Sequence, residues 1–403
     1  MMDMIEKPES NKLRKNWQLD EDIIFLNHGS FGACTKSTTE EQIRWMKRIE
    51  SEPVRFFERE FPQLMHEVRV NLANFLHCSA EDLALITNAT TGVNTILRSL
   101  KFERGDELLV PDHAYQACRN ALDYVSERWN ANTVVCQLPF PISDSNEIID
   151  SILASVTPKT KLAMLDFITS PTGYLLPIKK LVKELQARGV EVLLDAAHAP
   201  GMVELNLSDI GAEYTCGNCH KWLCTPKGSA FLHVRNDKQN KIHPLAISHG
   251  RSFPLGNNTR FRHEFDWIGT HDPSPWLTIK KTMEEIPKLI GGNWSDVMQH
   301  NHNLVIRGRD IVAEALQIDP PCPNHMIGSI STLKLPDSHS DRGIPLHDPD
   351  PLHERLLDEF KIQVPVWSWP SPRGRYIRIS AQLYNHIDEY RYLAEVLQSI
   401  ELT

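Results

Sequence analysis

Two segments of the sequence combine residue types that suit covalent amine chemistry. Asp195 ends the apolar run Val190–Leu194, and His220 and Lys221 follow within the segment Tyr214–Trp222. A lysine isolated among small and apolar residues is a candidate for a depressed pKa, which a Schiff-base amine needs. A buried carboxylate is costly unless a cation such as a pyridinium pairs with it. The two residues together predict a pyridoxal phosphate site, with Lys221 as the amine and Asp195 on the pyridine nitrogen.

A candidate anion site lies in the turn Asn88–Gly92. This turn follows the apolar run Leu83–Thr87 and precedes helical spacing over Val93–Leu100. Backbone N–H groups at such a helix start, together with threonine hydroxyls, suit the phosphate of the cofactor. The alternative is a simple N-cap by Thr90 or Thr91.

Three polar residues have both a functional and a purely structural interpretation. Asp195 could cap a helix after a βα turn, and His198, three residues later, could belong to that turn instead of facing a ligand. Arg378 lies in the strand-like run Tyr376–Ser380. It could bind a substrate carboxylate through two hydrogen bonds, or it could form a surface ion pair.

The segment Cys216-Gly-Asn-Cys219-His220 matches the pattern of covalent c-type haem attachment. That haem is normally fitted after export, and the polar segment at residues 1–17 contains no apolar leader. A thioredoxin-like redox pair is the other alternative, but it usually opens a helix near the start of a small domain. We interpret the cysteines as incidental neighbours of Lys221.

Length, composition and charge limit the class of protein. A chain of 403 residues predicts about two or three compact units. The net charge of −9 disfavours nucleic acid and anionic membranes as partners. No segment approaches the roughly 18 uncharged apolar residues of a membrane span. The eight cysteines are too sparse for a disulfide scaffold. We expect a cytoplasmic protein with reduced cysteines and without a metal site.

Strand-like and helix-like segments alternate along the chain. Short apolar runs occupy residues 83–87, 107–110, 133–138, 161–167 and 190–194, and helical spacing occupies residues 114–129, 145–154 and 178–188. This alternation predicts an α/β fold with a mostly parallel sheet and helices on both faces. Functional residues are then expected beyond the carboxyl ends of the strands.

A domain boundary is predicted at Gly291-Gly292, before the amphipathic stretch Trp294–Leu316. We predict an N-terminal arm (residues 1–45) that contributes to the substrate site and the small domain. A large cofactor-binding domain (46–290) and a smaller C-terminal α+β domain (291–403) follow it. The small domain is expected around residues 329–335, 351–360 and 376–380. The His-, Asp- and Pro-rich segment 338–351 predicts a mobile loop.

The ordered motifs of the chain resemble fold-type I pyridoxal-phosphate enzymes of the class V aminotransferase family. Within that family the chain is similar to the isopenicillin N epimerase-like branch, which is related to cysteine desulfurases and C–S lyases. The resemblance covers nearly the whole length and implies the transferase-like fold, with a seven-stranded type of sheet. It rests on Leu26–Gly32, Pro53–Phe57, Asn88–Gly92, Asp112–Tyr115, Thr169–Gly173, Asp195–His198, His220–Trp222, Gly269-Thr270 and Arg378.

The resemblance implies cofactor roles for matching residues. Lys221 would form the Schiff base and move the proton, and Asp195 would hold the pyridine nitrogen. Tyr115, or else His113, would stack on the ring face opposite Lys221, with Tyr115 preferred. The phenolic oxygen of the cofactor would be approached by His198 and Ser170. Its phosphate would be held by Ala89, Thr90, Asn218 and His220. In a homodimer with the active site at the subunit interface, Thr270 of the partner subunit would also reach the phosphate.

The resemblance also implies a substrate side. Arg378 would bind the carboxylate of the substrate, a small-molecule amino acid, with Asn27, His28, Gly29 and Arg55 nearby. Cysteine desulfurases carry a persulfide-forming cysteine ahead of this arginine, but residues 338–376 contain none, so sulfur transfer by that route is not expected. The indoles in Val364–Pro370 could wall the substrate pocket or pack in the core.

Two activities follow from the resemblance and share removal of the α-proton by Lys221. The first is epimerisation at the α-carbon, an isomerase activity, which needs a proton donor opposite Lys221 such as Tyr115, His113 or His28. The alternative is a C–S lyase that eliminates sulfur from cysteine or a cysteine sulfoxide conjugate. An aminotransferase and a non-catalytic cofactor-binding protein on the same fold come after these two.

Overall fold

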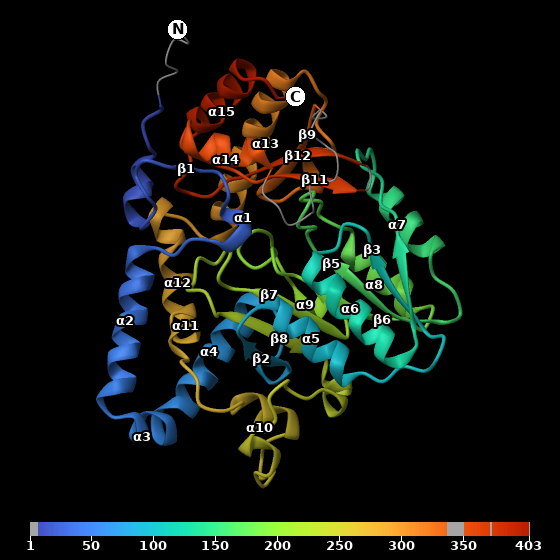
Figure 1. Ribbon diagram of the computed structural model, residues 1–403. Coiled ribbons are helices and arrows are strands. Elements are labelled where there is room, and N and C mark those ends of the chain that lie inside the picture. Colours follow the sequence, from blue (N-terminus) through green and yellow to red (C-terminus); the bar gives the residue numbers. More distant parts are fainter. Residues whose placement is uncertain (1–6, 337–349, 371–372, 403) are drawn as a thin grey trace.

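The structure, a computed structural model, describes residues 7–336, 350–370 and 373–402. The predicted mobile loop at 338–351 lies outside the described residues except for its last two positions. Figure 1 shows a larger α/β unit, a smaller unit above it formed by the C-terminal part, and N-terminal helices along one side.

Seven strands form the main sheet, in the order β2-β8-β7-β6-β5-β3-β4. All run parallel except β8, which is antiparallel to both β2 and β7. The predicted mostly parallel sheet is confirmed, whereas β7 and β8 were not predicted as strands. The strands are β2 (Leu83–Ile86), β3 (Glu107–Pro111), β4 (Asn132–Cys136), β5 (Thr160–Asp166), β6 (Glu191–Asp195), β7 (Tyr214–Asn218) and β8 (Ala230–Val234).

Helices cover both faces of this sheet because alternate strand residues point to opposite sides. Leu108, Met164 and Leu193 pack with helices α5 (Ala89–Ser99) and α6 (Gln116–Trp129). Leu109 and Leu165 pack on the other face with helices that are all amphipathic: α4 (Phe61–Leu76), α7 (Ser145–Ala154) and α8 (Ile178–Gln186). The two hydrophobic layers hold the strand ends in fixed positions.

The C-terminal unit consists of an antiparallel sheet and packed helices. Its strand order is β11-β12-β9, with β9 (Ile330–Leu335), β11 (Val366–Pro370) and β12 (Arg373–Ser380). Helix α13 (Trp294–Leu316) packs against α15 (Ile387–Ser399) and β9, and α14 (Pro351–Asp358) packs near β10 (Ile362–Gln363). The predicted small α+β domain is therefore present, while the numbered domain boundaries stay predictions.

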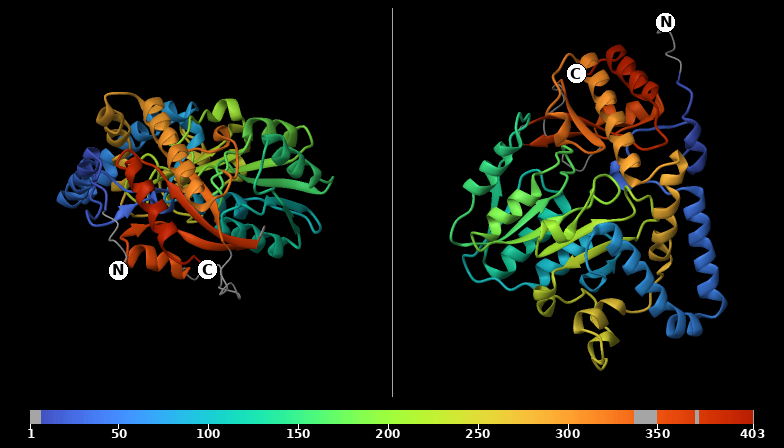
Figure 2. Two further views of the ribbon diagram at one scale, coloured as in Figure 1. Left: turned by 90° about the horizontal axis from the view of Figure 1, so that it is seen from above. Right: turned by 180° about the vertical axis from the view of Figure 1, so that it is seen from behind.

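The N-terminal segment joins the two units. Strand β1 (Ile24–Phe25) pairs in parallel with β10, and α1 (His28–Phe31) follows it. Helix α2 (Lys36–Ser51) then runs along the side of the molecule (Figures 1 and 2). The remaining helices are α3 (Pro53–Arg55), α9 (Leu207–Ile210), α10 (Arg260–Asp266), α11 (Ser274–Leu277) and α12 (Ile279–Glu285), with short 3₁₀ or π segments between them. None of the described helices is long and apolar enough to cross a membrane.

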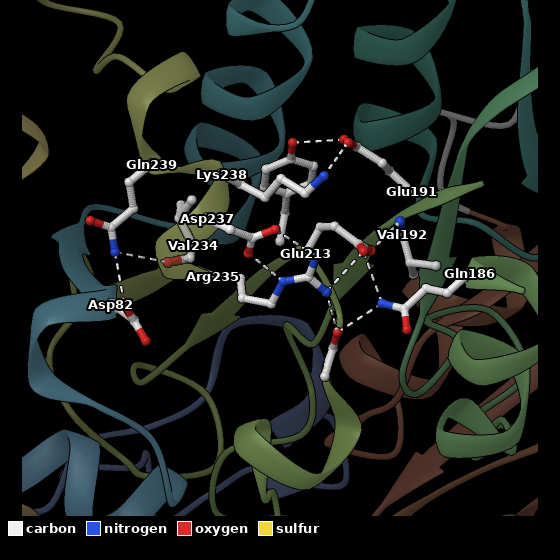
Figure 3. A network of polar contacts seen from close by, with 12 residues as sticks. Asp82, Gln186, Glu191, Val192, Glu213, Val234, Arg235, Asp237, Lys238 and Gln239 are labelled. Carbon is white, nitrogen blue, oxygen red and sulfur yellow. Dashed lines mark hydrogen bonds and ion pairs between the residues drawn. The ribbon is translucent and has the colours of Figure 1, made fainter. Parts of the chain in front are cut away.

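A buried carboxylate, Glu213, organises a polar network at the edge of the sheet where β6 and β7 begin (Figure 3). Its Oε1 accepts hydrogen bonds from Gln186 Nε2 at 2.9 Å and pairs with Arg235 at 3.0 Å. Its Oε2 accepts from the Val192 N–H at 2.9 Å. Beside it, Lys238 and the Tyr214 hydroxyl bind Glu191. Both oxygens of the Glu213 carboxylate therefore have hydrogen-bond partners within the chain.

Candidate active site

A cavity of about 330 Å³ opens where the three central strands of the main sheet end. Asp166, Asp195 and Asn218 are the last residues of β5, β6 and β7, and all three line it. Parallel strands bring their carboxyl ends to one edge, so residues far apart in the sequence meet there. The predicted residues that line the cavity are Ala89, Thr90, Tyr115, Ser170, Asp195, His198, Asn218, His220 and Lys221.

The Lys221 amine contacts the imidazole of His198, with 3.1 Å between Nζ and Nε2. The indole N–H of Trp222 donates to His198 Nδ1 at 3.3 Å. Because an indole nitrogen can only donate, Nδ1 is the acceptor and Nε2 carries the proton of the neutral ring. Burial and the charge of Lys221 lower the pKa of His198 well below its ordinary value, which keeps the ring neutral. The Nε2–H of His198 is therefore directed at Nζ and can donate to it once the amine of Lys221 has lost its proton.

The amine of Lys221 titrates near neutrality. Burial, reinforced by the charge on Arg378, lowers its pKa from the ordinary value of a lysine to about 8. Asp195 acts in the opposite direction but does not cancel this effect. A neutral amine can attack a carbonyl carbon or accept a proton, and an ammonium group cannot.

Asp195 is a buried carboxylate whose described partners are uncharged. The Cys118 thiol donates to its Oδ2 at 3.1 Å, and the Ala197 N–H donates to its Oδ1 at 2.9 Å. Burial raises the pKa of this carboxyl group. The alternative role as a helix cap does not apply, because the next helix, α9, begins only at Leu207. A cationic ligand would compensate the buried charge.

The start of α5 forms the opposite end of the cavity. Asn88 caps the helix, since its Oδ1 accepts from the Thr91 N–H at 2.8 Å; the expected alternative of a threonine cap is wrong. The N–H of Ala89 donates to Asn218 Oδ1 at 2.8 Å, which ties the helix start to the end of β7. Asn88, Ala89 and Thr90 line the cavity, so the positive end of the α5 dipole borders it and would favour an anion there.

Several lining residues were not singled out from the sequence: Ser30, Phe31, Asp166 and Lys227. Lys227 adds a cation to the wall and donates to the Gly32 carbonyl at 3.1 Å. Asp166 stands beside Asp195 in the strand register. It carries the same signal as Asp195, a carboxylate at the end of an apolar run, and that signal could have identified it.

Arg378 lies in a buried position beside the cavity. Its guanidinium donates to the Ser170 carbonyl at 2.6 Å, to Ser170 Oγ at 3.2 Å and to Ser30 Oγ at 3.0 Å. Burial lowers its pKa to about 10. These acceptors are uncharged, so the residue is no surface ion pair. Arg378 instead lines a second cavity of about 240 Å³, which shares Tyr115 and Ser170 with the first.

Tyr115 and His113 occupy different positions. Tyr115 is 47% exposed and lines both cavities. His113 is fully buried, with Nδ1 3.0 Å from Thr172 Oγ1 and its ring centroid 4.3 Å from that of Trp369. Burial lowers the pKa of His113 to about 3. The structure thus brings Tyr115, and not His113, into the wall that faces Lys221.

His28 lies beneath Lys221 and does not line either cavity. Its Nε2 is 3.0 Å from the Lys221 carbonyl oxygen, and its Nδ1 is 2.9 Å from the Tyr384 hydroxyl. A carbonyl can only accept, so Nε2 donates and Tyr384 donates to Nδ1. Gly32 reaches the same backbone at φ +67°, where an added Cβ would lie 2.1 Å from the His220 carbonyl oxygen. The N-terminal arm thus supports the backbone of Lys221.

The other predicted substrate residues have varied placements. Asn27 Oδ1 accepts from Ser30 Oγ at 2.6 Å, and an added Cβ on Gly29 would stand 3.8 Å from an Arg378 nitrogen. Neither residue lines either of the two cavities. Arg55 is exposed on α3, 3.5 Å from Glu60, and Thr270 is exposed after Gly269. Neither of these two lines the cavity of its own chain.

The cysteines of the Cys-x-x-Cys-His segment are free and buried. Cys216 packs with the α5 and α6 layer, and Cys219 packs with the layer on the other face. His220 lines the cavity, and its Nδ1 is 3.1 Å from the Ser229 carbonyl oxygen. Within the described ranges, no group of three or more His, Cys, Asp or Glu side chains is arranged to hold a metal ion.

Known proteins resemble this chain along almost its whole length. It is 29% identical to the isopenicillin N epimerase of Streptomyces clavuligerus, over 95% of this chain and 96% of that protein. It is 28% identical to a probable chloroplastic L-cysteine desulfhydrase of Arabidopsis thaliana, over 94% and 83%. A solved mutant of C-DES, with glycine covalently linked to its PLP cofactor, superposes with a TM-score of 0.76 at 17% identity and covers 94% of this chain and 97% of its own.

The family can now be stated. The structural likeness confirms the fold class predicted from the sequence, and the two enzyme activities predicted from the sequence are both named among the relatives. The family model described as Aminotransferase class-V matches residues 36–273, more than half of the sequence. The chain belongs to the class-V aminotransferase family.

Proposed function

We propose that this protein is a pyridoxal-phosphate-dependent enzyme that removes the α-proton of an amino acid and acts first as a C–S lyase. The observation that carries the proposal is the buried amine of Lys221 at the carboxyl edge of the sheet, whose pKa is lowered to about 8 and whose Nζ lies 3.1 Å from His198 Nε2. The named relatives include enzymes of cysteine and of isopenicillin N.

The residues of the cavity fit pyridoxal phosphate at each of its ends. Asp195, a buried carboxylate with uncharged partners, suits a pyridinium nitrogen. The α5 start, with Lys227 and His220 in the wall, suits a phosphate dianion. Tyr115 supplies an aromatic side chain on the cavity wall. When bound, the cofactor supplies an electron sink for the pair of electrons left at the α-carbon.

The residues of this chain then have separate tasks. Arg378 binds the substrate carboxylate, because its guanidinium is positioned by Ser170 and Ser30 without a competing carboxylate among those contacts. Lys221 takes the α-proton on Nζ. The N–H of His198 orients that amine, and Trp222 fixes the tautomer of His198. Asp195 would stabilise the positive charge of the pyridinium nitrogen at the buried end of the site.

The positions of the candidate proton donors relative to Lys221 favour elimination over epimerisation. Epimerisation requires a donor opposite Lys221, and of the three candidates only Tyr115 lines the cavity. Burial raises the pKa of Tyr115, so its proton is held more firmly. Loss of a β-leaving group requires no second acid. Isopenicillin N-like epimerisation is the second candidate, with Tyr115 as the donor.

The proposal includes a homodimer. Thr270 and Arg55 are both exposed and lie outside the cavity of their own chain, as residues that serve a second subunit would. The cytoplasmic location stays a prediction.

The test is a visible absorbance scan of the purified protein with added pyridoxal phosphate, during titration with L-cysteine, a cysteine sulfoxide and an aminoadipyl amino acid. Pyruvate and chirality are measured in parallel. Pyruvate release supports the lyase, and inversion of the α-carbon without pyruvate moves the assignment to the epimerase. No cofactor absorbance in any sample would contradict the whole proposal.

A further inference from the structure

The second cavity shares Tyr115 and Ser170 with the first, whereas Lys221 lines the first cavity alone. Strand β11 supplies Trp367 and Trp369 to its wall, while Pro171 and Pro365 add apolar surface. The Arg378 guanidinium lies 5.7 Å from the ring centroid of Trp367. The described lining of the cavity therefore combines aromatic and proline surfaces with one cation, Arg378, and with the polar residues Asp112, Gln116 and Ser170.

The positions of Lys221 and Arg378 determine where the side chain on the α-carbon of an amino acid substrate must lie. The inference rests on the proposed function, which directs the amine toward Lys221 and the carboxylate to Arg378. Ser170, which Arg378 contacts, lines both cavities, so the α-carbon lies at their junction. The side chain of the substrate is then directed into the second cavity.

The charges of this cavity discriminate between side chains. Among the described residues that line it, Arg378 is the single cation, and the substrate carboxylate uses it. The wall also contains Asp112, whose Oδ1 accepts from the Leu138 N–H at 2.9 Å. A second carboxylate on the substrate would find no further cation among the described residues that line the cavity. Aromatic and proline surfaces instead favour an apolar or aromatic group.

We propose that the second cavity is the side-chain subsite, and that it selects cysteine S-conjugates with a bulky, uncharged apolar or aromatic substituent. In the elimination, the C–S bond breaks and sulfur leaves with the bonding electron pair and takes up a proton as a thiol. The α-proton goes to Lys221. The released 2-aminoacrylate reacts with water to give pyruvate and ammonia, so the reaction is redox-neutral.

The test compares S-benzyl-L-cysteine with S-carboxymethyl-L-cysteine in the holoenzyme. We expect kcat/KM for pyruvate release to be at least about tenfold higher for the benzyl compound. Trp367→Ala should reduce this ratio to near one, and Trp367→Phe should restore most of it. Trp129→Phe, at the end of α6 outside both cavities, is the matched control and should keep the wild-type ratio.

Calorimetric titration of the same two compounds into the holoenzyme separates this proposal from the proposed function. Tighter binding of the benzyl compound that depends on Trp367 supports the subsite even if no pyruvate forms, in which case only the lyase assignment fails. Equal affinities and equal kcat/KM values for the two compounds would overturn the subsite. An unchanged preference in Trp367→Ala would overturn it as well.

Discussion

Two buried carboxylates stand at opposite edges of the main sheet and differ in their partners. Glu213, where β6 and β7 begin, is bound by Arg235, Gln186 and the Val192 N–H. Asp195, where β6 ends, has only a thiol and one N–H as described partners. Figure 3 shows the first arrangement, in which the chain itself supplies the compensating charge.

The difference separates structural charge from functional charge. At the edge where β6 and β7 begin, the Arg235 guanidinium and the Gln186 amide bind Glu213. These contacts connect β6, β7 and the end of β8. At the carboxyl edge, the described hydrogen-bond partners of Asp195 and Arg378 are uncharged, which is costly for buried charges. Under the proposed function, a bound ligand compensates these charges.

Lys221→Ala should produce the largest change in activity. Removing the amine removes both the covalent attachment and the proton acceptor, so kcat should fall by at least roughly 10⁴-fold. The visible absorbance of the attached cofactor should be lost in the scan. Retained absorbance together with retained pyruvate release would show that another amine does this work.

The paired variants Asp195→Asn and Glu213→Gln test the comparison itself. Asp195→Asn should reduce kcat roughly a thousandfold. Because burial raises the pKa of Asp195, its carboxylate destabilises the cofactor-free fold at neutral pH, and the amide should raise the midpoint of thermal unfolding.

Glu213→Gln should behave in the opposite way. The amide cannot accept from both Arg235 and the Val192 N–H, so the free energy of unfolding should fall by about 2 kcal/mol, with kcat kept within about twofold. Thermal unfolding of apoenzyme and pyruvate assays of holoenzyme measure both effects. Equal loss of activity in the two variants would contradict the division between the two edges.

Arg378→Gln should raise KM for amino acids about 30-fold, because a charge-assisted hydrogen-bonded pair with the carboxylate is lost. It should also alter cofactor loading of the apoenzyme. The loading rate should rise with pH as the Lys221 amine loses its proton, with a midpoint at about 8. Since the Arg378 charge lowers that pKa, its removal should move the midpoint to higher pH. An unchanged midpoint would show that burial alone sets it.

Among the variants at the carboxyl edge, Trp222→Phe should lower activity the least. The variant keeps an aromatic ring but removes the donor to His198 Nδ1, so His198 can adopt the other tautomer and lose its N–H toward Lys221. We expect kcat to fall about threefold to tenfold and cofactor content to remain. His233→Gln, a buried change on β8 away from the cavity, serves as the control. Equal effects in both variants would indicate a general loss of packing.

Much of this protein follows from its sequence. The alternation of apolar runs and helical spacing predicted the sheet and its helix layers. Asp195, at the end of one run, and the turn before α5, at the end of another, predicted the site at the carboxyl edge. These signals are local, because burial and helix capping act on neighbouring residues. The His220-Lys221 pair predicted the chemistry. Strands β7 and β8 and the cavity residue Asp166 were not identified, although Asp166 ends its strand just as Asp195 does.

Only the tertiary structure decided which of several equivalent residues face the cavity. Tyr115 and His113 are two positions apart, and the fold turns one toward Lys221 and encloses the other against Trp369. His28 lies in the motif expected to bind substrate, yet it holds the backbone of Lys221 from below. Residue type and spacing determine which chemistry is possible. Orientation and burial depend on packing between segments hundreds of residues apart, which no local pattern specifies.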